Sequence, residues 1–522
     1  MLIPKGNWAG RLVKSYKSGT DLVGGSSLRY PTSLGAQIQT CAFMVGDAGL
    51  QITALDGRGQ VKYFDLPERD AAIRYQCPDE GVPGAANAPD FAVETAAFSG
   101  DWWVAGKRYR AWATRQEWAS KGPLATRADF NRQLGDVGYW IKTTWREGDG
   151  GLASNLMARA MAALPGIPLG LQWYCWHTCP FDNNYPELFP ARPGMKEAVA
   201  WMKEQGILVM PYINGRLWDS VLESYSNAVP SATKTPDGAC YMDEYGGHRL
   251  AVMCPATNPW RQKMDELCDR MELELGVNAL YIDQVSASTP RPCHDKSHGH
   301  PLGGGAFWTE GYRELMRPIR EKAVARGVAL TSENANEPYM DSFDAHLTWF
   351  CHAYDDVPML PAVYSGYTVY FSSISDKKDT LDSFCAQQGR DFIFGCQLGW
   401  NDPWILDDDY REHLAFVERL CRERIAHKDF FLTGELLGEV PTPEGLPTVE
   451  VQWNRVGMYC DSTRFRMPAV LGAVWRDFGG TRRYTVLVNV SGDEQTFTHG
   501  EGAERKTVVI PPRGVVSEIT AK

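Results

Sequence analysis

Three places in the chain share one local design, in which a helical pattern ends at a glycine and an apolar strand begins at once. These joints are Gly206 before residues 207–213, Gly276 before residues 277–282, and Gly327 before residues 328–331. Glycine can adopt the left-handed conformation that closes a helix, so each joint predicts a helix followed by a strand. Repeated units of this kind predict an α/β fold with a mostly parallel sheet.

The segment before Gly276 has the clearest helical signals. Asn258 is suited to cap a helix and Pro259 to open it. The apolar residues that follow at helical spacing on one face are Trp260, Met264, Leu267, Cys268, Met271 and Leu275. The segment before Gly327 has a similar face, and we expect Pro318 to kink its helix.

Five further apolar stretches are strand candidates. They are residues 139–143, 170–175, 345–349, 368–372 and 392–398. Together with the three joints they make eight strands within roughly 300 residues, which is typical of a (β/α)8 barrel. A doubly wound sheet is the alternative fold, but the sequence has no glycine-rich dinucleotide motif after a first strand.

Both flanks of this region have the short alternating patterns of β-structure. On the N-terminal side the candidates are residues 37–45, 49–54, 60–64 and 91–98, followed by helical spacing over residues 100–113. On the C-terminal side they are residues 448–453, 467–475, 484–490, 495–499 and 506–510. We therefore predict a β-sandwich region over residues 1–120, the barrel over 121–433, and an antiparallel β-domain over 434–522.

Charge and hydropathy exclude several partners. The 53 basic and 64 acidic residues give a net charge of −11, which repels a nucleic-acid backbone. No apolar run approaches the roughly 20 residues of a membrane span, and the first ten residues contain no apolar leader segment. The 13 cysteines form no repeated framework, which favours free thiols in a reducing compartment. We expect a cytoplasmic protein, although a longer native form could be exported.

Two carboxylates end consecutive predicted strands. Asp283 follows the strand after Gly276, and Glu333 follows the strand after Gly327. Reacting groups of a barrel lie where its strands end, and neighbouring strands are about 4.8 Å apart. Retaining glycosidases hold two carboxyl groups about 5–5.5 Å apart. A strand-end carboxylate can instead cap a helix or pair with arginine, but two on successive strands favour catalysis.

Polar and aromatic residues at the other strand ends predict a sugar-binding pocket. The chain has 18 Trp, 22 Tyr and 20 Phe, whose flat faces suit sugar rings, although most tryptophans of a large protein fill its core. The candidates are Trp173, Trp176, His177, Asn214, Arg216, Asp219, Tyr281, Asn334, Trp400, Asn401 and Asp402.

The loop after Asp283 is rich in histidine and glycine. Its polar residues are His294, Asp295, His298 and His300. Imidazoles can bind zinc, copper or iron, but the spacing matches no tetrahedral motif with fixed intervals. We therefore interpret the three histidines as hydrogen-bonding groups for a polyhydroxylated ligand, with no metal.

The triplet Asn336-Glu337-Pro338 offers an alternative acid/base. An Asn-Glu-Pro triplet after a strand carries the acid/base in many β-glycosidase barrels. Those enzymes pair it with a glutamate on a late strand, and this sequence has none there. Glu337 is therefore the alternative to Glu333.

The segments around these residues resemble an uncharacterised family of bacterial glycoside hydrolases. The resemblance lies in residues 280–285, 294–305 and 331–339, and residues 100–118 resemble that family's passage from a β-supersandwich into its barrel. The chain is similar, more distantly, to the α-amylase, α-galactosidase and endo-α-N-acetylgalactosaminidase barrels, in which an Asp nucleophile ends the fourth strand.

The resemblance implies that Asp283 is the nucleophile and Glu333 the acid/base. Two features depart from those barrels. Tyr281 stands where amylase-like enzymes have Arg and α-galactosidases have Lys, and the N-terminal β region is short for a full supersandwich.

The predicted function is hydrolysis of an O-glycosidic bond with retention, in an oligosaccharide or polysaccharide. The preference for an α-linkage comes from the resemblance alone. The alternatives are an inactive carbohydrate-binding barrel and a metal-dependent hydrolase or isomerase that uses residues 294–300. The sugar, endo or exo action and the oligomeric state stay open.

Overall fold

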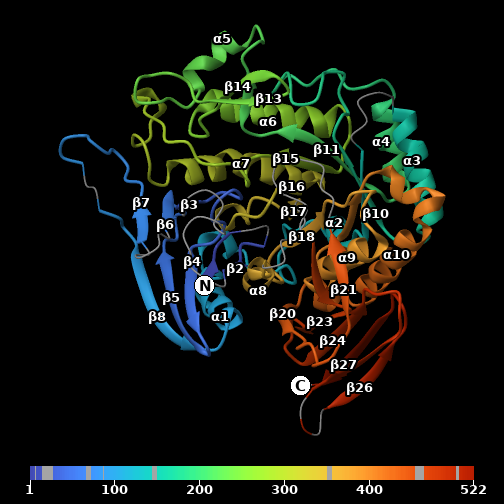
Figure 1. Ribbon diagram of the computed structural model, residues 1–522. Helices are drawn as coiled ribbons and strands as arrows, with labels where there is room; N and C mark the ends of the chain where they lie inside the picture. Colours follow the sequence, from blue (N-terminus) through green and yellow to red (C-terminus); the bar gives the residue numbers. More distant parts are fainter. Residues whose placement is uncertain are drawn as a thin grey trace.

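The protein was analysed as a computed structural model (Figure 1). The structure describes residues 1–5, 8–13, 27–65, 72–85, 88–143, 150–349, 356–452, 464–500, 502 and 505–521. In Figure 1 the N-terminal sheets lie at the left, the helix-covered barrel above and between, and the C-terminal sheets at the lower right.

Eight parallel strands form the central sheet. They are β9 (Tyr139–Thr143), β10 (Leu169–Trp173), β11 (Leu208–Asn214), β15 (Ala279–Asp283), β16 (Ala329–Glu333), β17 (Ala345–Trp349), β18 (Val369–Ser373) and β19 (Leu398–Asn401). β19 pairs with β9, and Phe371 of β18 bridges to Gln397 just before β19. The sheet therefore nearly closes on itself, which confirms the barrel and excludes the doubly wound alternative.

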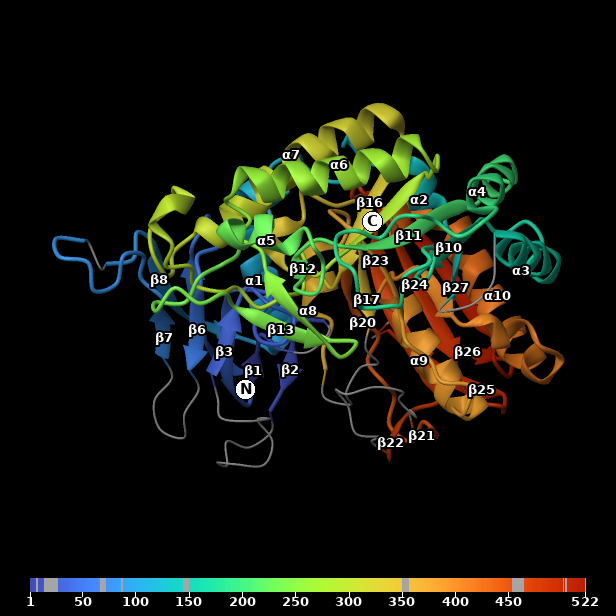
Figure 2. The ribbon, with the colours of Figure 1, turned by 90° about the horizontal axis from the view of Figure 1, so that it is seen from above.

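Helices cover the outside of the barrel. The long ones are α3 (Gly150–Ala163), α4 (Met195–Glu204), α6 (Asn258–Leu273), α7 (Phe307–Arg326), α9 (Leu381–Ile393) and α10 (Arg411–Ala426). The short ones are α2 (Arg132–Asp136), α5 (Tyr225–Ala228), α8 (Met359–Tyr364) and α11 (Lys428–Phe431). In Figure 2, α6 and α7 run along one side, and α3, α4 and α10 lie at another. No helix in the described part of the chain is long and apolar enough to cross a membrane.

The three predicted glycine joints are confirmed. Gly206, Gly276 and Gly327 have φ angles of 78°, 71° and 72°, in the left-handed region that lets a helix end and a strand begin. The predicted cap of α6 was wrong by one residue, because the helix already includes Asn258 and its N-cap is Thr257.

The last barrel strand lies later than predicted. Residues 392–398 were expected to form it, but Phe392 and Ile393 end α9 and the strand begins at Leu398. The Phe392 ring packs 4.9 Å from the ring of Phe431, between helices. A short apolar run does not by itself distinguish a buried helix from a strand, which explains the error.

The N-terminal region contains two sheets. One has the strand order β2 (Arg11–Leu12), β1 (Leu2–Ile3), β4 (Thr40–Val45), β5 (Ala48–Leu55) and β8 (Ala92–Ser99). The other has the order β3 (Ser27–Tyr30), β6 (Lys62–Asp65) and β7 (Ala72–Tyr75). Ile3, Tyr30, Cys41 and Phe64 form an apolar cluster with contributions from both sheets. The helical spacing predicted next is α1 (Trp102–Ala113), which leads towards the barrel.

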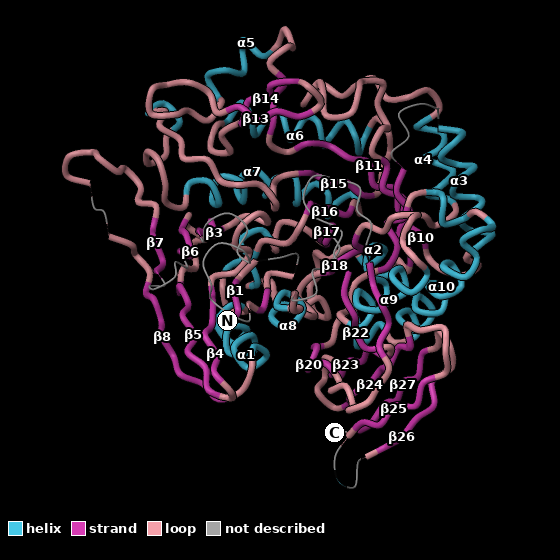
Figure 3. The backbone as a smooth tube through the Cα atoms, viewed as in Figure 1, coloured by secondary structure: helices cyan, strands magenta, loops and turns pink. Residues whose placement is uncertain are grey.

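The C-terminal region is antiparallel, as predicted. Its strands are β20 (Glu435–Glu439), β21 (Thr448–Gln452), β22 (Arg464–Pro468), β23 (Val470–Arg476), β24 (Arg482–Asn489), β25 (Gln495–His499), β26 (Lys506–Ile510) and β27 (Val515–Ala521). Figure 3 shows β23, β24, β25, β26 and β27 in magenta below the cyan helices α9 and α10. The single strand predicted over residues 467–475 is two strands separated at Ala469. Trp453 lies outside the described residues, and the domain boundaries at 120 and 433 stay predictions.

One small sheet was not predicted. It consists of β12 (Leu217–Asp219), β13 (Met242–Tyr245) and β14 (His248–Val252), inserted between barrel strand β11 and helix α6. Single turns of 3-10 helix occur at η1 (Glu117–Ala119), η2 (Val229–Ser231), η3 (Lys296–His298), η4 (Glu337–Tyr339), η5 (Pro403–Leu406) and η6 (Asp408–Tyr410).

Candidate active site

Asp283 and Glu333 occupy equivalent positions on adjacent strands. β15 and β16 pair in register at Tyr281 and Thr331, and each carboxylate lies two residues further along its strand. The hydroxyl of Ser332 donates a 2.7 Å hydrogen bond to the Ile282 carbonyl, which holds this register at the strand ends. Residues in register on neighbouring parallel strands point to the same side of the sheet. The two carboxyl groups therefore lie together at the C-terminal end of the barrel.

Asp283 is held by a tyrosine. Its side chain is 8% exposed, and the hydroxyl of Tyr212 on β11 donates a 2.9 Å hydrogen bond to Asp283 Oδ2. Burial raises the pKa of Asp283 to about 7, and the negative charge of Asp182 adds to this, whereas the Tyr212 hydrogen bond lowers it. The hydrogen bond therefore favours the ionised form of a carboxyl group that burial would otherwise keep neutral.

A chain of hydrogen bonds links Asp283 to Asp182. The hydroxyl of Tyr185 donates to Asp182 Oδ1 at 2.9 Å and lies 3.0 Å from the hydroxyl of Tyr212, which donates to Asp283. The two tyrosine hydroxyl groups supply two protons, whereas the chain contains three oxygen–oxygen contacts. All three contacts can be hydrogen bonds only when one of the two carboxyl groups is protonated and supplies the third proton. Asp182 and Asp283 are thus coupled through the two tyrosines.

Glu333 has a different environment. It is partly exposed, and no hydrogen bond from any described residue reaches its carboxylate. Its pKa lies well above the ordinary value, first because of burial, then because of the charges of Asp283 and Asp182. The Tyr212 hydrogen bond therefore favours a negative charge on Asp283 over one on Glu333.

Aromatic rings pack beside the carboxyl pair. The Tyr174 ring stacks on that of Tyr212 at 5.2 Å, and the Tyr212 ring stacks on that of Tyr281 at 5.9 Å. Trp400 of β19 lies 6.4 Å from Tyr174 and donates a 2.7 Å hydrogen bond from Nε1 to Gln172. These rings come from four different barrel strands or their ends, so barrel closure assembles them.

A buried lysine lies beside Trp400. Lys142 Nζ lies 4.2 Å from the Trp400 ring centre and 3.5 Å from Asp402 Oδ2. Burial lowers the pKa of Lys142, although the negative charge of Asp402 opposes the change. The lysine thus places an amino group beside Asp402 at this end of the barrel.

Four residues at the strand ends have left-handed backbone conformations although none is glycine. Gln284 (φ 63°) and Asn334 (φ 48°) directly follow β15 and β16, Trp349 (φ 63°) ends β17, and Trp400 (φ 60°) is the last residue but one of β19. Such conformations are uncommon for bulky residues and concentrate at functional sites. Their position supports the C-terminal end of the barrel as the location of the functional site.

The other strand-end residues predicted to bind substrate fall into two groups. Tyr281 and Trp400 belong to the aromatic cluster, and Asn214 Nδ2 lies 3.5 Å from the Tyr212 hydroxyl. Asp402 contacts this group through Lys142. Asn334, directly after Glu333, is fully buried, and neither polar atom of its side chain has a described hydrogen-bond partner.

The second group is buried in the strands and loops that support the cluster. Trp176 donates a 2.6 Å hydrogen bond to the Tyr212 carbonyl and so positions that tyrosine. Trp173 is buried within β10, and Asn401 Oδ1 accepts a hydrogen bond from Tyr139. Burial lowers the pKa of the fully buried His177 to about 4.

Arg216 and Asp219 act within the loop after β11. Arg216 forms an ion pair with Asp243 of β13. The Asp219 carboxylate lies 2.7 Å from Nδ1 of His248 and accepts a 2.8 Å hydrogen bond from the Asn184 backbone. Both residues therefore have partners within the protein.

Glu337 lies in a separate buried cluster. Its carboxylate is fully buried and accepts hydrogen bonds from Tyr30 at 3.0 Å, Gln39 at 2.9 Å, Tyr109 at 2.8 Å and Tyr364 at 2.7 Å. Of these donors, Tyr30 belongs to β3, Gln39 directly precedes β4, and Tyr109 belongs to α1. The structure thus gives Glu337 the position of an anchor between domains, and this weakens its prediction as an alternative acid/base.

His298 and His300 also lie in another cluster. Their ring nitrogens meet the thiols of Cys254 and Cys293. His294 lies in the same loop but outside that group, with its ring next to Gly303. The contacts of these histidines within the chain leave their predicted role in sugar binding without support.

Sequence reasoning missed Lys142, Tyr174, Asp182, Tyr185 and Tyr212. Tyr212 could have been found, because it lies two residues before Asn214 on the same strand and so shares its face. Asp182 and Tyr185 lie in a loop without regular structure, and no spacing in the sequence relates them to Asp283.

The fold and the carboxyl pair define a (β/α)8 barrel with two acidic groups at the ends of its fourth and fifth strands. The chain belongs to the family described as "Domain of unknown function (DUF6259)", whose model matches residues 88–374, more than half of the chain.

Two curated relatives carry glycosidase names. A protein of Bacteroides thetaiotaomicron named "Putative glycoside hydrolase" is 32% identical over 378 residues, which cover 69% of this chain and 54% of the relative. "Putative glycoside hydrolase 22789" of Monosiga brevicollis is 30% identical over 542 residues, covering 90% of this chain and 44% of the relative. The chain therefore spans about half the length of the curated relatives it matches.

Solved glycosidases share the fold. The α-N-acetylgalactosaminidase NagBb from Bifidobacterium bifidum, in complex with Gal-NHAc-DNJ, has a TM-score of 0.66 at 15% identity, covering 94% of this chain and 78% of its own. The α-galactosidase AgaA from Geobacillus stearothermophilus has a TM-score of 0.57 at 8% identity, covering 96% and 72%. These matches confirm the resemblance to glycoside hydrolase barrels that the sequence indicated.

Proposed function

We propose that the protein is a retaining glycoside hydrolase, with Asp283 as nucleophile and Glu333 as acid/base. The observation that carries the proposal is the equivalent position of the two carboxyl groups on adjacent strands. Adjacent strands are about 4.8 Å apart, which suits the separation of about 5–5.5 Å in retaining enzymes better than the wider inverting one.

The different environments of the two groups support their roles. Asp283 receives the Tyr212 hydrogen bond, so it can ionise and attack the anomeric carbon. Glu333 keeps its proton and donates it to the leaving oxygen as the glycosidic bond breaks. The Glu333 carboxylate then takes a proton from water, whose oxygen attacks the anomeric carbon and releases Asp283.

The substrate is an α-linked sugar in this proposal. The solved structures that share the fold support it, because they are named an α-N-acetylgalactosaminidase and an α-galactosidase. Glu333, the proposed acid/base, is the more exposed of the two residues.

The test compares Asp283→Asn, Glu333→Gln and Glu337→Gln with the wild type on aryl α- and β-glycosides of hexoses and N-acetylhexosamines. We expect kcat/KM to fall about 1,000-fold or more for the first two variants, since each removes a group that acts in the transition state. Glu337→Gln should keep the wild-type kcat, because its carboxylate is buried elsewhere.

Proton NMR of the first-formed anomer tests retention in the same samples. Near-normal turnover by both Asp283→Asn and Glu333→Gln would contradict the assignment, and an inverted product would reject the nucleophile role. Sugar binding without any turnover by the wild type would favour an inactive carbohydrate-binding barrel instead.

A further inference from the structure

Two thiols and two imidazoles meet in one place, away from the carboxyl pair. The potential ligand atoms of Cys254, Cys293, His298 and His300 all lie within 4.8 Å of one another. Cys254 follows β14, before α6, whereas the other three belong to the loop after β15. The fold thus brings together residues almost 40 positions apart, and sequence spacing alone does not reveal the set.

The distances match a tetrahedral zinc site. Cys254 Sγ lies 3.5 Å from His300 Nε2, and Cys293 Sγ lies 3.3 Å from His298 Nδ1. With Zn–S near 2.3 Å and Zn–N near 2.05 Å, a regular tetrahedron puts sulfur and nitrogen about 3.6 Å apart. The observed sulfur–nitrogen distances are close to that value.

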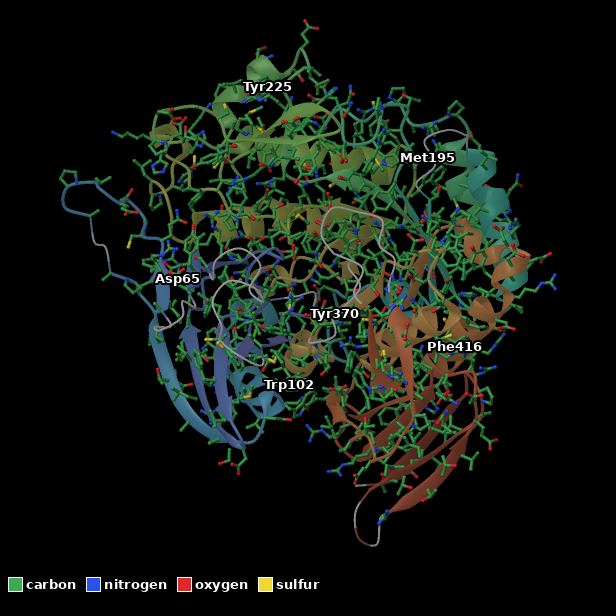
Figure 4. All side chains as sticks on the ribbon, in the orientation of Figure 1. Asp65, Trp102, Met195, Tyr225, Tyr370 and Phe416 are labelled. Carbon is green, nitrogen blue, oxygen red and sulfur yellow. The ribbon has the colours of Figure 1, made fainter. Side chains whose placement is uncertain are left out.

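The second nitrogen of each histidine has a carbonyl partner. His298 Nε2 lies 2.7 Å from the carbonyl of Pro230, and His300 Nδ1 lies 2.7 Å from that of Pro301. Zinc-binding histidines characteristically donate their other N–H to such an acceptor, which fixes the tautomer and the ring orientation. Figure 4 labels Tyr225, the first residue of α5. This helix leads into the turn η2, which contains Pro230.

The surroundings are those of a closed site. Both thiols are fully buried, and the His300 ring stacks on that of Phe307 at 4.0 Å. The backbone N–H of Lys234 lies 3.5 Å from Cys293 Sγ and can donate to a thiolate.

We propose that Cys254, Cys293, His298 and His300 bind one zinc ion, which has a structural role. Four protein ligands fill the tetrahedron and leave no position for a substrate or water. Binding releases one proton from each thiol, so the two thiolates balance the charge of Zn²⁺.

The ion would fasten the loop that follows Asp283. This loop carries three of the ligands and continues to the N-terminal region, where the Gly305 N–H donates to the Gln76 carbonyl at 2.9 Å and the Leu302 N–H to Asp79 at 2.6 Å. Zinc would therefore connect β14, the loop after β15 and the N-terminal region.

The first test measures metal content in protein purified without chelators. We expect about one zinc per chain in the wild type and less than about a tenth of that in Cys254→Ser and Cys293→Ser. Cys268→Ser is the matched control, because Cys268 is a buried cysteine on α6 outside the group, and His294→Ala is the control within the loop. Both controls should keep their zinc.

The second test needs no variant and so stands even if the cysteine variants fail to fold. Zinc is removed from the wild-type protein with a chelator and replaced by Co²⁺. Tetrahedral thiolate ligation should give strong visible bands and a sulfur-to-cobalt charge-transfer band in the near ultraviolet. A wild type that contains no zinc and gives no such spectrum, or a Cys254–Cys293 disulfide in the purified protein, would overturn the proposal.

Discussion

At the scale of single residues, one hydroxyl distinguishes two otherwise similar carboxyl groups. Asp283 and Glu333 lie at the ends of neighbouring strands, and burial raises the pKa of each. Only Asp283 receives the Tyr212 hydrogen bond, which favours its charge. Two carboxyl groups whose pKa values are pushed apart in this way can serve as nucleophile and acid in one reaction.

The pH dependence of activity follows from this difference. We expect kcat/KM to fall as the pH drops below about 7, because Asp283 becomes protonated and loses its nucleophilic charge. In Tyr212→Phe the donor that lowers this pKa is lost, so the acid limb should move to higher pH by about one unit. The measurement is kcat/KM against pH for both proteins. An unchanged acid limb in the variant would show that Tyr212 does not affect the ionisation that controls activity.

At the scale of secondary-structure elements, the end of β16 and the turn after it combine two proposed roles. The strand ends at Glu333, and within four residues the chain reaches Glu337 at the start of η4. There Tyr30 of β3, Gln39 just before β4 and Tyr109 of α1 donate hydrogen bonds to its carboxylate. One short segment thus carries a candidate catalytic group and the polar contact that joins the barrel to its N-terminal neighbour.

The role of Glu337 as a contact between the barrel and the N-terminal region predicts that its substitution lowers stability and leaves catalysis unchanged. Glu337→Gln replaces an acceptor oxygen by an N–H₂ group that faces hydroxyl donors, so we expect the free energy of unfolding to fall by about 2 kcal/mol. The measurement is chemical denaturation alongside kcat. If kcat falls by orders of magnitude while stability is unchanged, Glu337 acts in the chemistry and its role as an anchor is wrong.

At the scale of the whole molecule, one apolar cluster runs through all three regions. It includes Trp8 near the N-terminus, the barrel core, and Trp475 of β23. The Glu435 carboxylate forms ion pairs with Lys107 of α1 and Arg476 of β23. Burial alone would raise the pKa of Glu435, but the positive charges of Lys107 and Arg110 outweigh this effect and lower the pKa to about 2. The flanking regions are therefore parts of one packed body.

Such continuity predicts one cooperative unfolding transition. Trp475 packs 5.3 Å from Phe431 and donates a 3.1 Å hydrogen bond to the Ile393 carbonyl, so Trp475→Ala should cost about 3–5 kcal/mol and lower the Tm of that single transition. Phe478→Ala, in the same region but 53% exposed, is the control and should change stability by less than about 0.5 kcal/mol. Calorimetry checks both, and a separate early transition for the C-terminal region in Trp475→Ala would contradict the continuous core.

Sequence patterns were enough to predict the barrel because the relevant signals are local. Gly206, Gly276 and Gly327 reveal helix ends through the backbone freedom of glycine alone. Periodicity failed at residues 392–398, where an apolar run fits helix and strand equally well and the packing of Phe392 on Phe431 decides. Asp283 and Glu333 could be paired in advance, because consecutive strands of a barrel are neighbours.

The remaining site depended on contacts between segments that no spacing connects. Asp182, Tyr185 and Tyr212 come from a loop and a neighbouring strand, and only the packed structure brings their hydroxyl and carboxyl groups into hydrogen-bond distance of one another. Cys254 joins His298 and His300 for the same reason. The sequence by itself therefore determined which elements form and which carboxylates end them. The tertiary structure decided which side chains meet, because hydrogen bonds and metal coordination depend on distance in space and not on distance along the chain.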